Sequence, residues 1–208
     1  EIRTPMNGIV GFAELLNEPE VEEDKKSQYI NIITSNAYHL LDLINDIIDI
    51  SKIEAGQTNV NLSETNINQI LAEVYSILKP NAEKKNLNFT YTTPLPDNQA
   101  NTITDTLKVR QILINLVSNA LKFTEKGSIR FGYEIKNNFI EFHITDTGTG
   151  VPIDGIEHIF GRFRQLDNQP NDSRTGTGLG LAISKAYTEL LGGEIGLTSE
   201  INVGTRFF

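Results

Sequence analysis

One face of the helix predicted from Asp105 to Phe123 carries two amides and a cation, namely Asn115, Asn119 and Lys122. These residues fall at positions i, i+4 and i+7, which share one side of an α-helix. Asparagine is a poor residue for the middle of a helix, so two of them one turn apart among leucine, valine and alanine need a reason. Amide oxygens beside a lysine could hold Mg²⁺ and phosphate. A solvated polar stripe is the alternative that this helix leaves open.

A second candidate is a carboxylate on the apolar face of a predicted strand. In the strand that begins at Phe139, the side chains of Phe142 and Ile144 share one parity, which Asp146 continues. A buried carboxylate is costly unless hydrogen-bond donors reach it, and the following segment 147–150 (TGTG) would let a ligand approach the backbone closely. We expect Asp146 to accept a hydrogen bond from an exocyclic amine such as that of adenine. An aspartate that caps a glycine turn is the alternative interpretation.

A third candidate is the run of alternating glycines at 176–183 (GTGLGLAI), which leads directly into a predicted helix. Exposed amides at a helix N-terminus attract anions, so a polyphosphate could bind there. The spacing matches neither the Rossmann fingerprint nor the Walker loop, because it has no Gly-Lys-Ser/Thr and no third glycine at the dinucleotide interval. A nucleotide pocket built on these residues must therefore be of another kind.

The first 57 residues predict a helical hairpin. Two helical patterns are separated by the acidic, proline-containing loop 17–24. The second pattern repeats apolar residues at spacings of three and four from Ile30 to Ile47, with more apolar surface than the first helix can cover. Pairing of two hairpins into a four-helix bundle would cover it, so we expect a homodimer.

After Gln57 the pattern alternates strands with helices. The clearest strands are 128–135 and 139–145, with a turn at 136–138, and the clearest helices are 66–84, 105–123 and 179–191. This mixture predicts an α/β sandwich attached to the hairpin, and hence an α+β chain with domains at 1–57 and 58–208.

Composition excludes several classes of protein. Eighteen basic and 27 acidic residues give a net charge of −9, the wrong sign for binding a polyanionic duplex, so we expect no nucleic-acid partner. The chain has no cysteine, which excludes disulfides and thiolate metal sites. Asp42 and Asp46 interrupt its most apolar stretch, so no segment could span a bilayer. The chain begins without methionine and ends in an apparent strand, and we expect it to be a fragment of a longer protein.

Six short segments resemble, in order and spacing, the sequence boxes of sensor histidine kinases. They are 1–9 (EIRTPMNGI), an H box without its first residue, 115–124 (NLVSNALKFT), the N box, 146–150 (DTGTG), the G1 box, 159–165 (IFGRFRQ), the F box, 176–181 (GTGLGL), the G2 box, and 204–207 (GTRF), the G3 box. The resemblance covers essentially the whole chain, and the joint occurrence of six boxes is very specific.

The resemblance implies a dimerisation and phosphotransfer hairpin followed by an ATP-binding domain of the Bergerat (GHKL) fold, which Hsp90, gyrase and MutL share. Asn119 would hold Mg²⁺, Asp146 would bind the adenine amino group, and segment 160–177 would form a lid over the nucleotide. Arg164 would contact the γ-phosphate, with a solvated lid arginine as the alternative. The nucleotide-binding residues implied in this way are Asn115, Asn119, Lys122, Asp146, Gly148, Gly150, Arg164, Gly176, Thr177, Gly178, Leu179, Gly180 and Thr205.

In this family a histidine immediately before the H-box glutamate attacks the γ-phosphorus of ATP, and the phosphoryl group then passes to an aspartate of a receiver domain. That position would precede Glu1. Glu1 resembles the acid/base partner that takes the imidazole proton, and Thr4 matches the position that orients water when the receiver is dephosphorylated. Of the chain's own histidines, we expect His143 and His158 at the surface, while His39 adjoins the apolar seam without the following Glu and Thr-Pro.

The function implied by the resemblance is an ATP-dependent protein-histidine kinase that phosphorylates a histidine preceding Glu1 and then a response-regulator receiver domain, in cis or in trans. An ATP-binding scaffold, or a response-regulator phosphatase without autokinase activity, is the alternative. An ATP-hydrolysing machine would share the nucleotide site, but the opening 3–7 (RTPMN) and the hairpin point away from it. The amino-acid sequence of segment 3–9 resembles that of hybrid kinases, which carry an attached receiver domain. We expect this part in the cytoplasm and the full-length protein to be anchored in the cell membrane through upstream segments.

Overall fold

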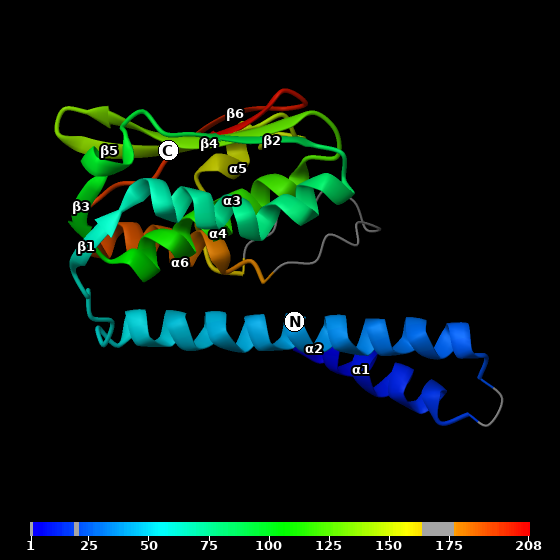
Figure 1. Ribbon diagram of the computed structural model, residues 1–208. Coiled ribbons are helices and arrows are strands. Elements are labelled where there is room, and N and C mark those ends of the chain that lie inside the picture. The colour runs from blue at the N-terminus through cyan, green and yellow to red at the C-terminus, as the bar shows by residue number, and fades with distance from the viewer. Residues whose placement is uncertain (1, 19–20, 164–176) are drawn as a thin grey trace. The chain divides into compact units, whose positions relative to one another are not determined.

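The computed structural model describes residues 2–18, 21–163 and 177–208 of the chain. The chain divides into two compact units, Glu1–Gln57 and Thr58–Phe208 (Figure 1). Within the described residues, no helix is long and apolar enough to cross a membrane.

The first unit is the predicted helical hairpin. Helix α1 spans Arg3–Leu16 and helix α2 spans Glu23–Glu54. The two helices pack against each other, with the rings of Phe12 and Tyr29 5.4 Å apart. Large apolar side chains nevertheless stay exposed within this one chain, among them Met6, Val10, Ile30, Leu41 and Ile44.

The second unit contains a five-stranded sheet in the order β2-β4-β5-β7-β6. Only β2 and β4 run parallel, and the other neighbours are antiparallel. The strands are β2 (Asn88–Thr92), β4 (Ser128–Lys136), β5 (Phe139–Asp146), β6 (Leu197–Glu200) and β7 (Gly204–Phe207). Between β4 and β5, Asn137 and Asn138 both have positive φ, as a two-residue hairpin turn requires. A separate two-stranded sheet pairs β1 (Ser63–Asn66) with β3 (Asn101–Thr104), and a short 3₁₀ helix, η1 (Asp97–Gln99), precedes β3.

Three helices cover one face of the larger sheet (Figure 1). They are α3 (Ile67–Lys84), α4 (Thr106–Phe123) and α6 (Gly180–Leu190), and a single-turn helix α5 covers Ile153–Ile156. Helices α3 and α4 begin one residue later than predicted because Asn66 and Asp105 are their N-caps, each accepting a hydrogen bond from a backbone N–H of the first turn. The core between these helices and the sheet includes Leu71, Val74, Val117, Ile129 and Phe131, all fully buried.

Candidate functional site

Asn115 joins helix α4 to the beginning of helix α6. Its side-chain amide donates to the carbonyl oxygen of Gly180 at 3.1 Å and to the hydroxyl of Ser184 at 3.4 Å. Its amide oxygen accepts a hydrogen bond from Gln111. The glycine-rich segment that opens α6 is therefore held beside the polar face of α4, and the Asn115 side chain is the link.

Asn119 lies one turn further along α4 and is half-buried. Its side-chain amide has no hydrogen-bond partner among residues 2–18, 21–163 and 177–208. The ammonium group of Lys122, another turn on, lies 4.9 Å from the centre of the Phe123 ring. The predicted polar face is thus present on α4. The side-chain amide of Asn119 remains available for a ligand, because no described residue forms a hydrogen bond with it.

Asp146 is the last residue of β5 and is 6% exposed. Its carboxylate accepts a hydrogen bond from the backbone N–H of Gly148 at 2.8 Å. Burial raises the pKa of this carboxyl above its ordinary value, while the backbone N–H groups of Gly148 and Thr205 act in the opposite direction. The predicted position on the core face is confirmed, and the carboxylate has fewer donors than full compensation for burial requires.

Two glycines shape the space after Asp146. A Cβ atom on Gly148 would collide with the carbonyl oxygen of Phe123 and lie 2.9 Å from the Asp146 carboxylate. Gly150 has φ +71°, and a Cβ there would collide with the carbonyl oxygen of Glu200. A side chain at either position would collide with neighbouring backbone, and at Gly148 with the Asp146 carboxylate too, so the local backbone requires glycine.

At the start of α6 the backbone is already partly engaged. The hydroxyl of Thr177 accepts a hydrogen bond from the N–H of Leu179 at 3.1 Å, and the Leu179 side chain is fully buried. The carbonyl oxygen of Gly178, which has φ +63°, accepts from the N–H of Phe163. Of the amides predicted for phosphate, that of Leu179 is thus occupied by Thr177.

The remaining predicted residues lie elsewhere. Thr205 is buried on β7, directly opposite Asp146 in the sheet, and its hydroxyl lies 2.9 Å from that of Ser199. Thr4 is exposed on α1, in the other unit. Glu1, Arg164 and Gly176 lie outside the described residues.

Gly204, the first residue of the G3 box at 204–207, was not among the predicted site residues. It has φ +138°, and a Cβ there would collide with the carbonyl oxygen of Asp146. Gly204 therefore lets β7 pair closely with the end of β5. The signal that could have found it is a glycine at the first position of a strand.

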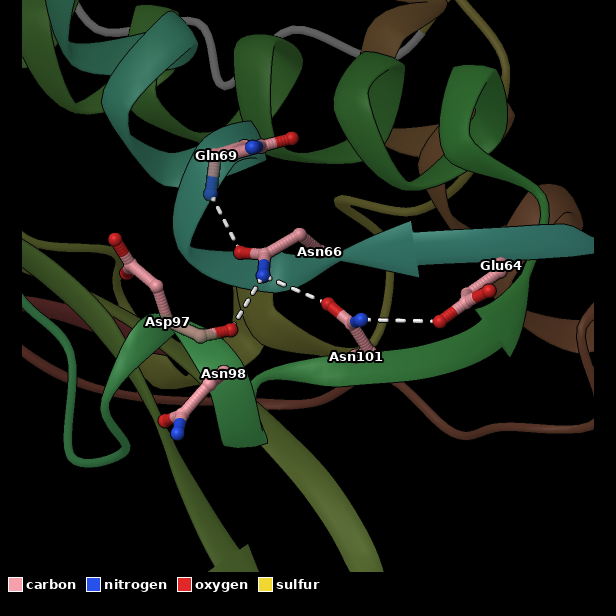
Figure 2. Close-up of a pocket in the computed structure, with 6 residues that line it drawn as sticks. All are labelled: Glu64, Asn66, Gln69, Asp97, Asn98 and Asn101. Atoms are coloured by element: carbon pink, nitrogen blue, oxygen red, sulfur yellow. Dashed lines mark hydrogen bonds between the residues drawn. The ribbon is translucent and has the colours of Figure 1, made fainter.

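None of the predicted nucleotide-binding residues lines the pocket of about 450 Å³ that Figure 2 shows. The pocket is lined by Glu64, Asn66, Gln69, Asp97, Asn98 and Asn101. The side chain of Asn66 donates to the carbonyl oxygen of Asp97 and to the side chain of Asn101, which in turn donates to Glu64. These polar groups largely satisfy one another and hold the N-terminus of α3 against β3.

Two family models match the chain. Residues 104–208 match "Histidine kinase-, DNA gyrase B-, and HSP90-like ATPase", and residues 1–56 match "His Kinase A (phospho-acceptor) domain". The two matches fall on the two structural units.

Curated relatives match over the whole chain. It is 38% identical to the sensor histidine kinase GacS of Pseudomonas protegens, 36% to the aerobic respiration control sensor protein ArcB of Escherichia coli, and 35% to the autoinducer 2 sensor kinase/phosphatase LuxQ of Vibrio vulnificus. It spans 23%, 27% and 25% of their lengths, respectively, or about a quarter of each.

Solved histidine kinase structures resemble almost the whole chain. Full-length ShkA in complex with AMPPNP has a TM-score of 0.76 and 32% identity, over 99% of this chain and 42% of that one. The histidine kinase ThkA in complex with the response regulator protein TrrA has a TM-score of 0.75 and 26% identity, over 99% of this chain and 57% of that one.

Proposed function

This chain belongs to the family of sensor histidine kinases, and from that premise we propose that it is the core of a protein that uses ATP to phosphorylate its own histidine. The phosphoryl group then passes to an aspartate of a response-regulator receiver domain. The observation that carries the proposal is the buried carboxylate of Asp146, followed by two obligatory glycines, in the unit that matches the ATPase family.

The residues after β5 fit an adenine ring. The Asp146 carboxylate accepts one short backbone hydrogen bond and has lone pairs left for an exocyclic amine. A side chain at Gly148 or Gly150 would collide with the backbone of Phe123 or Glu200, so these glycines let the backbone pack closely around the end of β5. In this assignment Asp146 orients the base, and Thr205 on the neighbouring strand supports the carboxylate from β7.

The polar face of α4 and the start of α6 fit the phosphates. The unused amide of Asn119 would hold Mg²⁺, which when bound neutralises charge on the phosphate oxygens. Lys122 adds positive charge on the same face. The backbone at Gly176–Gly180 would bind phosphate oxygens, apart from the amide of Leu179, and Arg164 would contact the γ-phosphate.

The transfer itself is an in-line displacement. A nitrogen of the phosphoacceptor imidazole, on a histidine preceding Glu1, forms a bond to the γ-phosphorus while the bond from that phosphorus to the β,γ-bridging oxygen breaks, and ADP leaves. We assign Glu1 to take the imidazole proton. We assign Thr4, which is exposed on α1, to orient the water that dephosphorylates the receiver, and phosphatase activity is therefore the second candidate function.

We further propose that the chain works as a homodimer with a receiver domain as its partner. The exposed apolar side chains of α1 and α2 support dimerisation, because they need a surface to cover them. ThkA, which the chain resembles, is solved in complex with a response regulator, and this supports a receiver partner in cis or in trans.

The test is labelling by γ-³²P-ATP and Mg²⁺ of a longer form of the protein that includes the natural residues before Glu1. Label that is lost in acid and kept in alkali identifies phosphohistidine. Label of any other stability, or no label, contradicts the autokinase assignment. In that case a titration with Mg-ATP distinguishes a binding scaffold or phosphatase from a wrong nucleotide site.

A further inference from the structure

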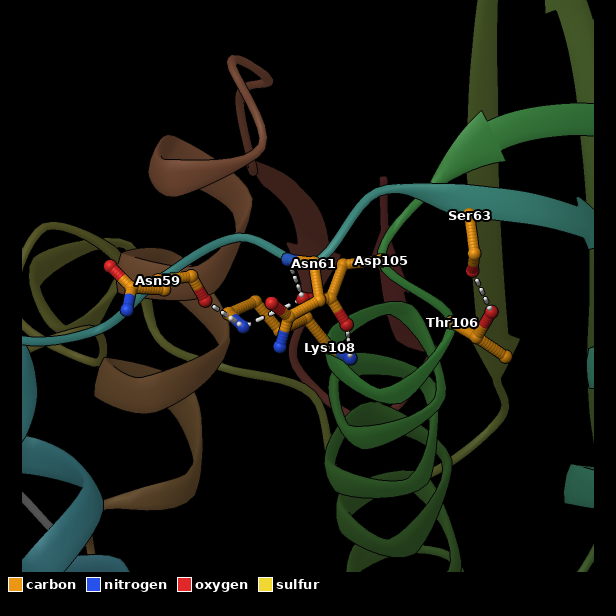
Figure 3. A network of polar contacts seen from close by, with 6 residues as sticks. All are labelled: Asn59, Asn61, Ser63, Asp105, Thr106 and Lys108. Carbon is orange, nitrogen blue, oxygen red and sulfur yellow. Dashed lines mark hydrogen bonds and ion pairs between the residues drawn. The ribbon is translucent and has the colours of Figure 1, made fainter.

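Residues 57–62, between α2 and β1, form neither helix nor strand, yet two side chains at the N-terminal end of α4, one of them its N-cap, bind their backbone (Figure 3). The N–H of Asn61 donates to the Asp105 carboxylate at 2.9 Å. The ammonium group of Lys108 donates to the carbonyl oxygen of Asn59 at 2.8 Å. Connecting segments usually leave such backbone groups to water, so two side-chain contacts in three residues need an explanation.

Asp105 and Lys108 form an ion pair of 2.7 Å, with side chains only 3% and 11% exposed. The carboxylate also caps α4 by accepting the backbone N–H of Lys108. Burial would raise the pKa of Asp105, but the hydrogen bonds from Lys108 and Asn61 together hold that pKa below its ordinary value. A buried ion pair is costly unless further hydrogen bonds compensate for its burial, and here the Asp105 carboxylate accepts three and the Lys108 ammonium group donates two.

The other side of the connector is fixed by the end of α2. Gly56 has φ +62°, its N–H donates to the carbonyl oxygen of Ile53, and the N–H of Gln57 donates to that of Lys52. These two bonds and the positive φ make a Schellman cap, which ends the helix and satisfies two of its last carbonyl groups. Between Gln57, which belongs to the cap, and Asn59, which Lys108 binds, lies a single residue, Thr58.

We propose that the Asp105–Lys108 pair is a clasp that confines the joint between the two units to the backbone around Thr58, and thereby positions bound ATP for transfer to the phosphoacceptor. The proposal rests on the proposed kinase function. The clasp acts on α4, the helix that also carries Asn119, so it ties the joint directly to the nucleotide-binding face. Asp105 and Lys108 are positioning residues, since neither is assigned a contact with ATP.

The size of the effect follows from tether length. The effective concentration of a tethered reactant falls roughly as the −3/2 power of the length of its flexible tether. Without the clasp, the free segment would grow from about one residue to about five, 58–62, which lowers the effective concentration roughly tenfold. Because binding of ATP to its own unit does not use the joint, the loss should appear in the rate of transfer alone.

Lys108→Met tests this while leaving Asp105 to cap α4. We expect autophosphorylation to slow about 3- to 10-fold with the Kd for Mg-ATP unchanged, and the amide of Asn61 to exchange its hydrogen faster. Lys108→Arg, which keeps the cation, should restore most of the rate. Lys85→Met is the matched control, because Lys85 also donates to two backbone carbonyls, those of Leu121 and Thr124, but contacts no connector residue.

A second measurement does not need kinase activity. The chain has no cysteine, so spin labels can be attached at Ser35→Cys on α2 and Lys84→Cys on α3, both exposed, in protein diluted with unlabelled chains. The distance distribution between the labels should broaden in Lys108→Met and stay unchanged in Lys85→Met. An unchanged distribution, or equal slowing of transfer in both variants, would overturn the clasp. If the wild-type protein incorporated no ³²P from ATP, the proposed function would be refuted. The distance between the spin labels would still decide whether the clasp confines the joint.

Discussion

The hairpin and the ATPase unit differ in how completely they bury their apolar side chains. Helices α3, α4 and α6 and the larger sheet enclose a continuous core, in which residues such as Leu71 and Val117 are fully buried. In the hairpin, Ile30, Leu41 and Ile44 remain 41–54% exposed. The ATPase unit therefore completes its interior within one chain, whereas the hairpin leaves an apolar surface for which we propose a second chain.

Within the ATPase unit, polar side chains differ in how completely their neighbours satisfy them. In the ATPase unit the clasp residues are satisfied by neighbours, while Asp146 and Asn119 have polar atoms that the described neighbours do not fully use. Asn115, which is also assigned to the nucleotide, is already hydrogen-bonded inside the chain, so the unused hydrogen-bonding capacity in the candidate site lies at Asp146 and Asn119. The comparison can be tested unit by unit.

The largest effect is expected from a carboxylate placed in the completed core. Val117→Asp on α4 buries an unpaired charge where the native side chain is 0% exposed, so it should destabilise the ATPase unit by about 4 kcal/mol or more and unfold it. Thermal unfolding followed by circular dichroism measures this.

The matched change in the hairpin is Ile44→Asp on α2. It should leave the unfolding transition of the ATPase unit in place and reduce self-association, measured by sedimentation at micromolar concentration. Loss of the ATPase transition in Ile44→Asp, or unaltered self-association, would contradict the distinction between the two units.

The next largest effect concerns Asp146. Asp146→Asn removes a charged acceptor, so Mg-ATP affinity should fall roughly 10- to 100-fold, about 1.5–3 kcal/mol, measured by calorimetric titration. Asp154→Asn, on an exposed aspartate of α5, is the control and should keep the affinity.

The same variant should make the ligand-free protein more stable at neutral pH. The raised pKa of Asp146 means that the folded protein binds this proton more tightly than the unfolded chain, so ionisation above that pKa costs stability. Asparagine avoids this cost, and the gain should vanish as the pH falls below 3.8, where both states are protonated. A ligand-free Asp146→Asn protein that is less stable at pH 7 would show that the carboxylate serves the fold.

A smaller effect on unfolding free energy is expected when one glycine in each unit is replaced by alanine. Gly150→Ala forces a side chain into a left-handed backbone and against the Glu200 carbonyl, which should cost about 1–3 kcal/mol of unfolding free energy. Gly11→Ala in α1 meets nothing within 4 Å in this chain and should stabilise the hairpin by about 0.5–1 kcal/mol. Denaturant titrations of both variants measure the difference in sign. If both changes were stabilising, the segment after Asp146 would not require glycine.

Local signals in the sequence predicted a large part of the fold. Caps at Asn66 and Asp105 set the starts of two helices to within one residue, and alternation of apolar residues gave β4 and β5. The predicted family and the hairpin followed by an α/β domain are confirmed. The four-residue strands β1, β3 and β6 were not predicted, because so short a segment shows no periodicity, and β1 and β3 are also defined by pairing with each other across about 40 residues.

The candidate site was predictable in its residue types and less so in its contacts. Parity alone correctly placed Asp146 on the core face. The bond from Asn115 to Gly180 joins residues 65 positions apart, and the bond from Asn61 to Asp105 joins residues 44 apart, so neither leaves a local pattern. The roles of Glu1, Arg164 and Gly176, the Mg²⁺ and the homodimer stay predictions.

The smallest effect is expected from His143, which the sequence placed at the surface and the structure places half-buried on β5. Its Nδ1 atom is buried and has no hydrogen-bond partner among the described residues. Burial is the main cause that lowers the pKa of His143 below 6.5, and the positive charges of Arg206 and Lys136 act in the same direction. The negative charges of Glu134 and Glu141 oppose this shift. The unfolded chain therefore takes up this proton more readily, and stability should fall as the pH drops below 6.5.

His143→Gln should remove this dependence, so the unfolding free energy of the ATPase unit should change less between about pH 7.5 and 5 than in the wild type. The slope of that free energy against pH should differ between the two proteins by the equivalent of less than about one bound proton per molecule. His39→Gln, on α2 of the hairpin, is the matched control and should leave the slope for the ATPase unit unchanged. Urea titrations at several pH values measure both slopes. If the slope persisted in His143→Gln, another group of the ATPase unit would cause the loss of stability at low pH. The imidazole of His143 would then protonate without loss of stability, which requires that water reach its Nδ1 atom in solution.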